Sequence, residues 1–159
     1  GLALELQGLA EPDALRQRFL YPQPRVALGR ALRGVASGCI DVSDGLVGDV
    51  GKLCVASRCG AVLQVDQLPL SAELRAWTAP ARAVELALTG GDDYELCFTL
   101  PPARRVALET AWPAAHAAHG VADPGFRVIG ISRAEPGIEI RDAETVIQLS
   151  HSGFDHFAP

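Results

Sequence analysis

The chain has 159 residues, of which 48% are hydrophobic and 21% charged, and its formal net charge is -5 at pH 7. This length predicts a single domain, residues 1–159, with a core large enough to need no disulfide or metal for stability. The 14 basic residues are scattered, which argues against a nucleic-acid-binding surface, and no apolar run approaches the roughly 18 residues that cross a membrane.

The first half of the chain predicts helices and then a strand–helix–strand unit. Two prolines, Pro22 and Pro24, end the first helix because neither can continue it. Hydrophobic residues from Leu46 onward recur at the spacing of a core-facing helix, and Gly60 stands where its C-terminal cap is expected. The expected elements are helices at 12–20, 26–32 and 46–54 and strands at 39–42 and 61–65.

The second half predicts more helices and several short strands. Pro80 suits the first turn of a helix, and Pro113 is expected to interrupt one. The expected elements are one or two helices at 71–88, a helix at 102–112, and strands at 96–100, 128–131, 138–140 and 146–149. This order predicts an α/β sandwich with helices packed on a mixed sheet, one that is not purely parallel.

The four cysteines are Cys39, Cys54, Cys59 and Cys97, each in or beside an apolar stretch. They could form two disulfides or a zinc site. Cys54 and Cys59 are five residues apart on a predicted helix, so we expect their thiols to face different sides, and the spacing does not suit zinc. Reduced core thiols of a cytoplasmic protein are therefore favoured.

The first stretch that departs from the hydrophobic pattern is Asp-Val-Ser-Asp-Gly-Leu at 41–46. A strand leads here into a helix N-terminus, where free backbone N–H groups favour anions. Ser43 or Asp44 could simply cap the helix, but a cap does not explain Asp41, which continues an apolar run. Two carboxylates flanking a hydroxyl also suit magnesium, which takes one or two carboxylates beside water and phosphate oxygens.

The second such stretch is Gly-Gly-Asp-Asp-Tyr-Glu-Leu at 90–96, which places three acids and a tyrosine between a glycine pair and a strand. It is consistent with a helix stop followed by a solvated loop. The glycines also permit positive φ and a close approach of backbone to a ligand. A structural loop and a binding loop both remain open.

Together these two stretches resemble the C-terminal domain of thiamine-monophosphate kinases. Tyr-Pro-Gln-Pro-Arg at 21–25 and Gly-Phe-Asp-His-Phe at 153–157 also fit that family. The four motifs stand in the family's order and extend over nearly the whole chain. One departure is Asp92, where the family usually has glutamate, so the charge is retracted by about one methylene.

The resemblance implies a mixed α/β sandwich of the aminoimidazole-ribonucleotide-synthetase C-terminal-domain type. Enzymes of the family transfer the γ-phosphoryl group of ATP to thiamine monophosphate, which gives thiamine diphosphate and ADP. Their N-terminal domain binds the nucleotide and usually forms a homodimer interface. The chain has no methionine and opens at Gly1, so we expect that domain to be absent and this fragment to be inactive alone.

The resemblance also implies roles for five residues. Asp41 and Asp44 would bind magnesium, and Ser43 would contact a phosphate of ATP. Asp92 would contact the thiamine moiety, and Phe154 would offer it an aromatic face. No residue of the chain is expected to be a covalent catalyst, since phosphoryl transfer depends mainly on positioning and charge neutralisation.

Three other functions are compatible with parts of the sequence. The chain could be the same domain of another ATP-using superfamily member, a synthetase or a maturation factor. It could be a stand-alone ligand-binding module, or a structural domain whose acids are caps and loop residues. The Tyr-Glu-Leu loop at 94–96 and the motif at 153–157 favour the kinase.

Overall fold

The computed structural model describes residues 13–117 and 125–149. Short 3₁₀ turns occur at Val65–Gln67 and Pro102–Arg104. No helix within these described ranges is long and apolar enough to cross a membrane. The elements in chain order are α2 (Asp13–Leu20), α3 (Val26–Ala31), β1 (Gly38–Asp41), α4 (Leu46–Ser57), β2 (Gly60–Gln64), α5 (Ala72–Trp77), α6 (Pro80–Thr89), β3 (Leu96–Thr99), α7 (Arg105–Ala117), β4 (Gly130–Arg133), β5 (Gly137–Asp142) and β6 (Thr145–Ile147).

The strands form two sheets. β1 and β3 pair antiparallel, and the larger sheet has the order β4-β2-β5-β6. β2 runs parallel to β5, whereas the other two pairs are antiparallel. Most of β2 is buried, as expected for a continuous apolar run in the middle of a sheet. The prediction of a mixed sheet is therefore confirmed.

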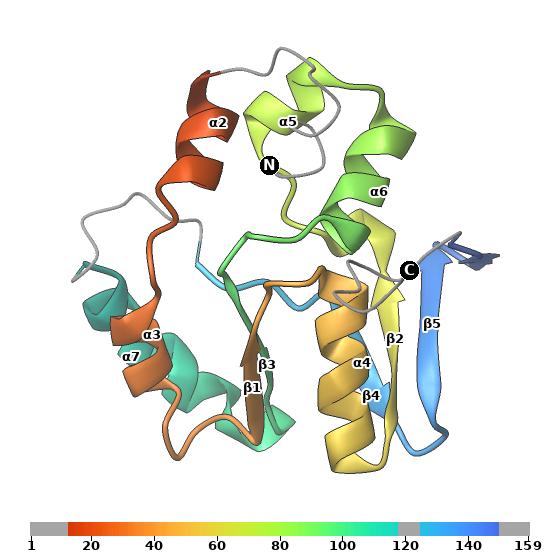
Figure 1. Ribbon diagram of the computed structural model, residues 1–159. Helices are drawn as coiled ribbons and strands as arrows, with labels where there is room; N and C mark the ends of the chain where they lie inside the picture. The colour runs from red at the N-terminus through yellow and green to blue at the C-terminus, as the bar shows by residue number, and fades with distance from the viewer. Residues whose placement is uncertain (1–12, 118–124, 150–159) are drawn as a thin grey trace.

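Helix α4 stands between the two sheets (Figure 1) and contacts β1, β2, β5 and α6. Its apolar stripe recurs every three to four residues, so one broad face is directed to the core. The turn that carries the first acidic stretch therefore leads directly into a helix that is packed against the core. The buried members of this core are Val42, Leu46, Val47, Val50, Cys54, Ala61, Leu63, Leu68, Leu88 and Ile140.

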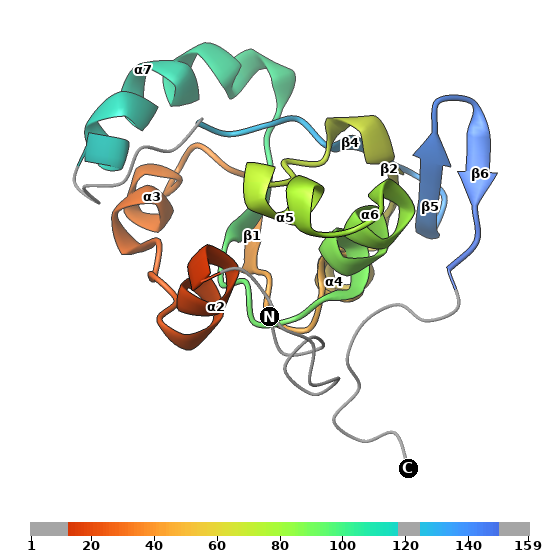
Figure 2. The ribbon, with the colours of Figure 1, turned by 90° about the horizontal axis from the view of Figure 1, so that it is seen from above.

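A second core joins α3, α7 and β3 on the other side of the β1–β3 pair. Figure 2 shows α3 and α7 together at one end of the molecule and the β5–β6 hairpin at the opposite end. Leu28, Leu32, Leu108 and Trp112 are buried there. The rings of Trp112 and Phe126 meet edge to face with centroids 5.3 Å apart, a favourable aromatic geometry.

The C-terminal end of α4 differs from the prediction. Arg58 adopts the left-handed conformation with φ 53°, and the N–H of Cys59 donates to the carbonyl of Cys54 at 3.0 Å. This is a Schellman-type ending, which turns the chain back onto the helix. Gly60 therefore lies in β2 and not at the cap, and Cys59 packs against Cys54 instead of facing away. Burial, and then the neighbouring Cys59 thiol, raise the pKa of Cys54.

Two other predicted boundaries are wrong. Helix α7 continues through Pro113 to its end at Ala117, because burial of Leu108 and Trp112 on the same helix offsets the one backbone hydrogen bond that proline removes. The strand expected at 128–131 begins at Gly130, where pairing with β2 starts.

Candidate functional site

The two acidic stretches lie side by side, as an extension of the β1–β3 pair. The N–H of Val42 donates to the carbonyl of Glu95 at 2.9 Å, and the N–H of Tyr94 donates to the carbonyl of Val42 at 2.8 Å. One step further, the N–H of Asp92 donates to the carbonyl of Ser43 at 2.9 Å. Segments some fifty residues apart in the sequence are thereby joined into one surface. We call residues 41–45 the first loop and residues 90–95 the second loop.

Glycine is required at two positions where the loops meet other backbone. A Cβ atom on Gly91 would lie 2.5 Å from the carbonyl oxygen of Ser43. Gly45 has φ +112°, and a Cβ atom there would lie 2.8 Å from the carbonyl oxygen of Thr89. The sequence suggested that the glycine pair could let backbone approach a ligand; at Gly91 the close partner is the chain's own backbone.

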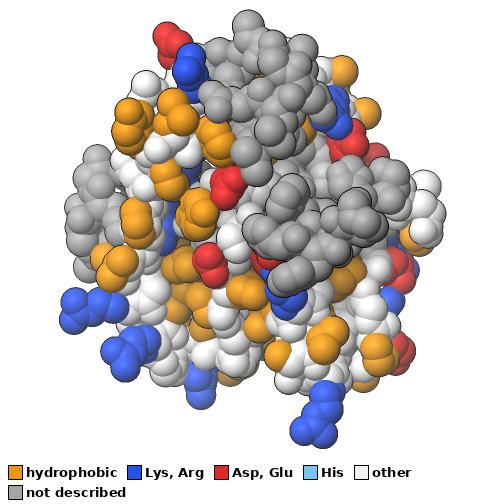
Figure 3. Space-filling view, in the orientation of Figure 1, with side chains coloured by type: hydrophobic (Ala, Val, Ile, Leu, Met, Phe, Trp, Pro, Cys, Tyr) orange, Lys and Arg blue, Asp and Glu red, His pale blue; other side chains and the backbone are white. Residues whose placement is uncertain are grey.

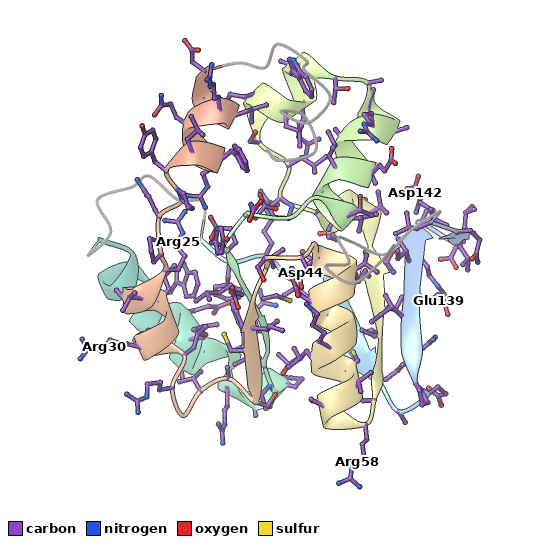
Figure 4. The ribbon with its side chains drawn as sticks, in the orientation of Figure 1. Arg25, Arg30, Asp44, Arg58, Glu139 and Asp142 are labelled. Atoms are coloured by element: carbon purple, nitrogen blue, oxygen red, sulfur yellow. The ribbon has the colours of Figure 1, made fainter. Side chains whose placement is uncertain are left out.

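The first loop carries both residues predicted to bind magnesium. Asp41 ends β1 with an exposed side chain, so its place in the strand does not by itself require a ligand. The Asp44 side chain is 23% exposed and forms an ion pair with Lys52. Figure 4 shows Asp44 at the N-terminal end of α4.

The donor chemistry of Asp41 and Asp44 fits magnesium, which prefers hard oxygen ligands and takes one or two carboxylates. Among residues 13–117 and 125–149, no three histidine, cysteine, aspartate or glutamate side chains gather closely enough to hold a metal ion. Water, a phosphate or another polypeptide segment would therefore have to complete the coordination.

The first loop is fixed by Asp49, which the sequence analysis missed. Asp49 is only 1% exposed, and its Oδ2 atom accepts hydrogen bonds from the N–H groups of Ser43 and Asp44, both at 2.9 Å. Lys52 donates to its Oδ1 atom at 2.7 Å, and hydrogen bonds to Asp44 and Asp49 raise the pKa of Lys52. An acid within the apolar stripe of α4, three residues after Leu46, is the signal that could have revealed it.

The helix cap also differs from the prediction. The residue at the N-cap of α4 is Gly45, and no side chain caps it. Ser43 and Asp44 lie two residues and one residue earlier, and their backbone N–H groups are bound by Asp49. Because neither side chain serves as the N-cap, the capping interpretation of this stretch is wrong.

The second loop has a strained backbone. Asp92 and Tyr94 both have positive φ, 64° and 52°, although neither is glycine. Such conformations are uncommon for residues with side chains and cluster at binding sites. The hydroxyl of Tyr94 donates to Oδ1 of Asp92 at 3.0 Å, and this bond raises the pKa of Tyr94.

Two arginines bind the second loop through the carboxylate of Glu95. Buried Arg25 donates from Nη2 to Oε1 of Glu95 at 2.8 Å and from Nε to Oε2 at 3.0 Å, and Arg18 also bonds to Glu95. The motif at 21–25 therefore anchors the loop, a role that the sequence did not reveal. Burial raises the pKa of Asp93, which lies in the same loop, to about 6.

The surroundings combine acidic and apolar surface. Figure 3 shows acidic side chains near the centre of this face, one of them beside a basic side chain, with hydrophobic side chains around them and further Lys and Arg side chains at the margin. A cavity of about 1380 Å³ has Gly91, Asp92 and Asp93 of the second loop in its lining, together with Leu74 of α5. Phe154 lies outside the described residues, so its contact with substrate stays a prediction.

The fold belongs to a known class. No family model matches the chain, but a solved structure of PurL from Thermotoga maritima aligns with a TM-score of 0.53 at 13% identity, over 77% of this chain and 20% of that one. At that identity the likeness concerns the fold alone. The prediction of an α/β sandwich of the aminoimidazole-ribonucleotide-synthetase type is confirmed.

Closer relatives narrow the assignment. The chain is 42% identical over 159 residues to thiamine-monophosphate kinase of Escherichia coli K12, which covers 98% of this chain and 46% of that protein. The crystal structure of thiamine-monophosphate kinase from Stenotrophomonas maltophilia aligns at 36% identity with a TM-score of 0.73, over 87% of this chain and 45% of that one. A structure of AaThiL complexed with AMPPCP and TMP aligns at 28% identity with a TM-score of 0.71, over 98% of this chain and 46% of that one.

The resemblance seen in the sequence is therefore confirmed, and the chain corresponds to the C-terminal half of thiamine-monophosphate kinases. It spans about half the length of the curated relatives that it matches.

Proposed function

We propose that the chain is the C-terminal part of an ATP-dependent kinase that phosphorylates thiamine monophosphate to thiamine diphosphate. The observation that carries this proposal is the 42% identity to a thiamine-monophosphate kinase over 98% of the chain. The pairing of the two acidic loops supports it, because motifs distant in sequence contribute to one surface. Another superfamily activity is less well supported, since the likeness to PurL at 13% identity concerns the fold alone.

In this proposal the first loop serves the phosphoryl group. Asp41 and Asp44 hold magnesium, which when bound neutralises charge on the phosphate oxygens. Ser43 donates its hydroxyl to a phosphate of ATP. The chain contributes position and charge to the transfer and no covalent intermediate.

The second loop serves the acceptor. Asp92 offers a carboxylate in the lining of the cavity, and its bond to the hydroxyl of Tyr94 fixes its orientation. A carboxylate is suited to the cationic thiazolium of thiamine monophosphate. Phe154, outside the described residues, is proposed to stack on the same ligand.

The remaining parts of the enzyme lie outside the chain in this proposal. The chain matches 46% of the E. coli enzyme, which leaves room for a nucleotide-binding domain of similar size that also forms a homodimer. A cytoplasmic location is proposed because all four cysteines are free.

The test is ADP release from ATP and magnesium by the full-length protein and by the isolated chain. We expect turnover by the full-length protein only when thiamine monophosphate is added, and none by the chain alone. Turnover by the purified chain would contradict the two-part site. A full-length protein that ignores thiamine monophosphate would contradict the kinase assignment.

A further inference from the structure

Asp49 is the most deeply buried charged side chain of the described residues, at 1% exposed. Removing a carboxylate from water is unfavourable by several kcal/mol unless it is fully paired. The side chain accepts three hydrogen bonds, two from backbone N–H groups and one from Lys52. These three hydrogen bonds offset the cost of removing the Asp49 carboxylate from water.

The partners of Asp49 show that it does not act as a helix cap. A capping side chain binds the free N–H groups of the first helical turn, which in α4 begins with Leu46. Asp49 binds instead the N–H groups of Ser43 and Asp44, which precede the helix. It therefore fixes the backbone of the first loop to α4, and not the start of α4 itself.

Lys52 extends this arrangement from backbone to side chain. It is the only lysine in the sequence, its side chain is 53% exposed, and its ammonium group pairs with both Asp44 and Asp49. A compact ammonium group can bridge two carboxylates in this way. The buried carboxylate of Asp49 is thereby linked to the carboxylate that is proposed to bind the metal.

We propose that Asp49 and Lys52 are positioning residues: Asp49 fixes the backbone of Ser43 and Asp44, and Lys52 orients the Asp44 side chain. The consequence for metal binding rests on the proposed function, whereas the anchoring of the loop does not. Neither residue touches substrate in this proposal.

Two double variants of equal charge isolate the anchor. In Asp49→Asn with Lys52→Gln, the amide oxygen of asparagine can still accept both loop N–H groups, and the glutamine oxygen can accept from the asparagine NH₂ group. In Asp49→Ala with Lys52→Gln, the side chain at position 49 offers no acceptor to these two N–H groups. The single variant Asp49→Asn should be worse than its double variant, because its NH₂ group would face the Lys52 ammonium.

The first readout is backbone amide exchange in the chain, followed by NMR. The amides of Ser43 and Asp44 should exchange at least about tenfold faster in the alanine double variant than in the asparagine one. The amides of Val62 and Leu63 in the buried strand β2 report global unfolding and should be alike in both. Equal exchange at Ser43 and Asp44 in the two variants overturns the proposal. So does an alanine variant in which all four amides accelerate together.

The second readout is paramagnetic broadening of the Asp41 and Asp44 amides on titration with Mn²⁺. The midpoint should rise by about twofold or more in the asparagine double variant, which loses the Lys52 contact to Asp44, and should be at least about fivefold higher again in the alanine one. Equal midpoints would contradict a positioning role toward the metal. If Mn²⁺ broadens neither amide in the wild-type chain, the proposed metal site is wrong, while amide exchange still decides whether Asp49 anchors the loop.

Discussion

The two loops of the candidate site are held in contrasting ways. The first loop is bound by residues five to eight positions away on the helix that follows it, Asp49 and Lys52. The second loop depends on Arg18 and Arg25, which bond to Glu95 across 77 and 70 residues. The side-chain contacts of the first loop are therefore local in the sequence, whereas those of the second loop come from far along the chain.

The contrast extends to the backbone. The first loop needs one glycine with positive φ, Gly45, whereas the second places Asp92 and Tyr94 in conformations that side chains disfavour. Strain of this kind is maintained only where surrounding contacts determine the conformation. We infer that hydrogen bonds to Asp49 fix the first loop. The second loop has an unfavourable backbone conformation, and its contacts with arginine offset that cost.

The largest effect is expected from the first loop. Asp44→Asn in the full-length protein should lower the rate of phosphoryl transfer at least about a hundredfold, since a metal ligand contributes several kcal/mol of charge stabilisation. The fold should be retained because the carboxylate is not a helix cap. Asp66→Asn, at an exposed position in the 3₁₀ turn, is the control and should leave the rate unchanged. Normal kinetics for Asp44→Asn would contradict the proposal that Asp44 binds magnesium.

Separating the two loops should have the next largest effect. Gly91→Ala would place a methyl group 2.5 Å from the Ser43 carbonyl oxygen, so the free energy of unfolding should fall by about 2–3 kcal/mol. Gly51→Ala is the matched control, because nothing lies within 4 Å of its Cβ position in α4. It should raise stability by about 0.5–1 kcal/mol through helix propensity. Urea denaturation measures both, and equal effects would contradict the close packing of the loops.

The long-range anchor of the second loop is tested by Arg25→Ala. Because Arg25 is buried and bidentate to Glu95, its loss should destabilise the chain by about 1–2 kcal/mol. Arg82→Ala removes an ion pair between partly exposed side chains, Arg82 and Glu85, and should change stability by less than about 0.5 kcal/mol. Similar losses in the two variants would show that the anchor is an ordinary surface pair.

A smaller effect is expected from the pH dependence of Asp93. Its folded-state pKa of about 6 lies above the usual aspartate value of 3.8, so the native state binds more protons than the unfolded state between these values. Stability contributed by the protonated group is therefore lost as pH rises from about 4 to 6. Asp93→Asn cannot ionise, so its stability relative to wild type should rise by about 1 kcal/mol across this window. A constant difference from pH 4 to pH 7 would contradict the burial of the carboxyl group.

The sequence predicted most elements because hydrophobic periodicity is strong in α4, β2 and α6. It failed where tertiary contacts decide the outcome. Burial of Leu108 and Trp112 keeps α7 helical through Pro113, and Arg58 ends α4 in a conformation that propensity alone would assign to glycine.

The site was predictable in part for the same reason. The motifs indicated which loops matter, but not that Asp92 and Ser43 are joined by a backbone hydrogen bond. Asp49 could have been found, since a lone acid in an apolar stripe is unfavourable without partners. Arg25 could not, because its partner Glu95 is 70 residues away and no local pattern links them.

The central claim is that the two loops have different tasks within one site, and steady-state kinetics of Asp92→Asn in the full-length protein tests it most directly. The variant should raise the KM for thiamine monophosphate by about fivefold or more, since it loses a charge facing a cationic ligand. The KM for ATP should stay within about twofold of wild type. An unchanged KM for thiamine monophosphate, or an equal rise in both constants, would contradict the division between a phosphoryl loop and an acceptor loop.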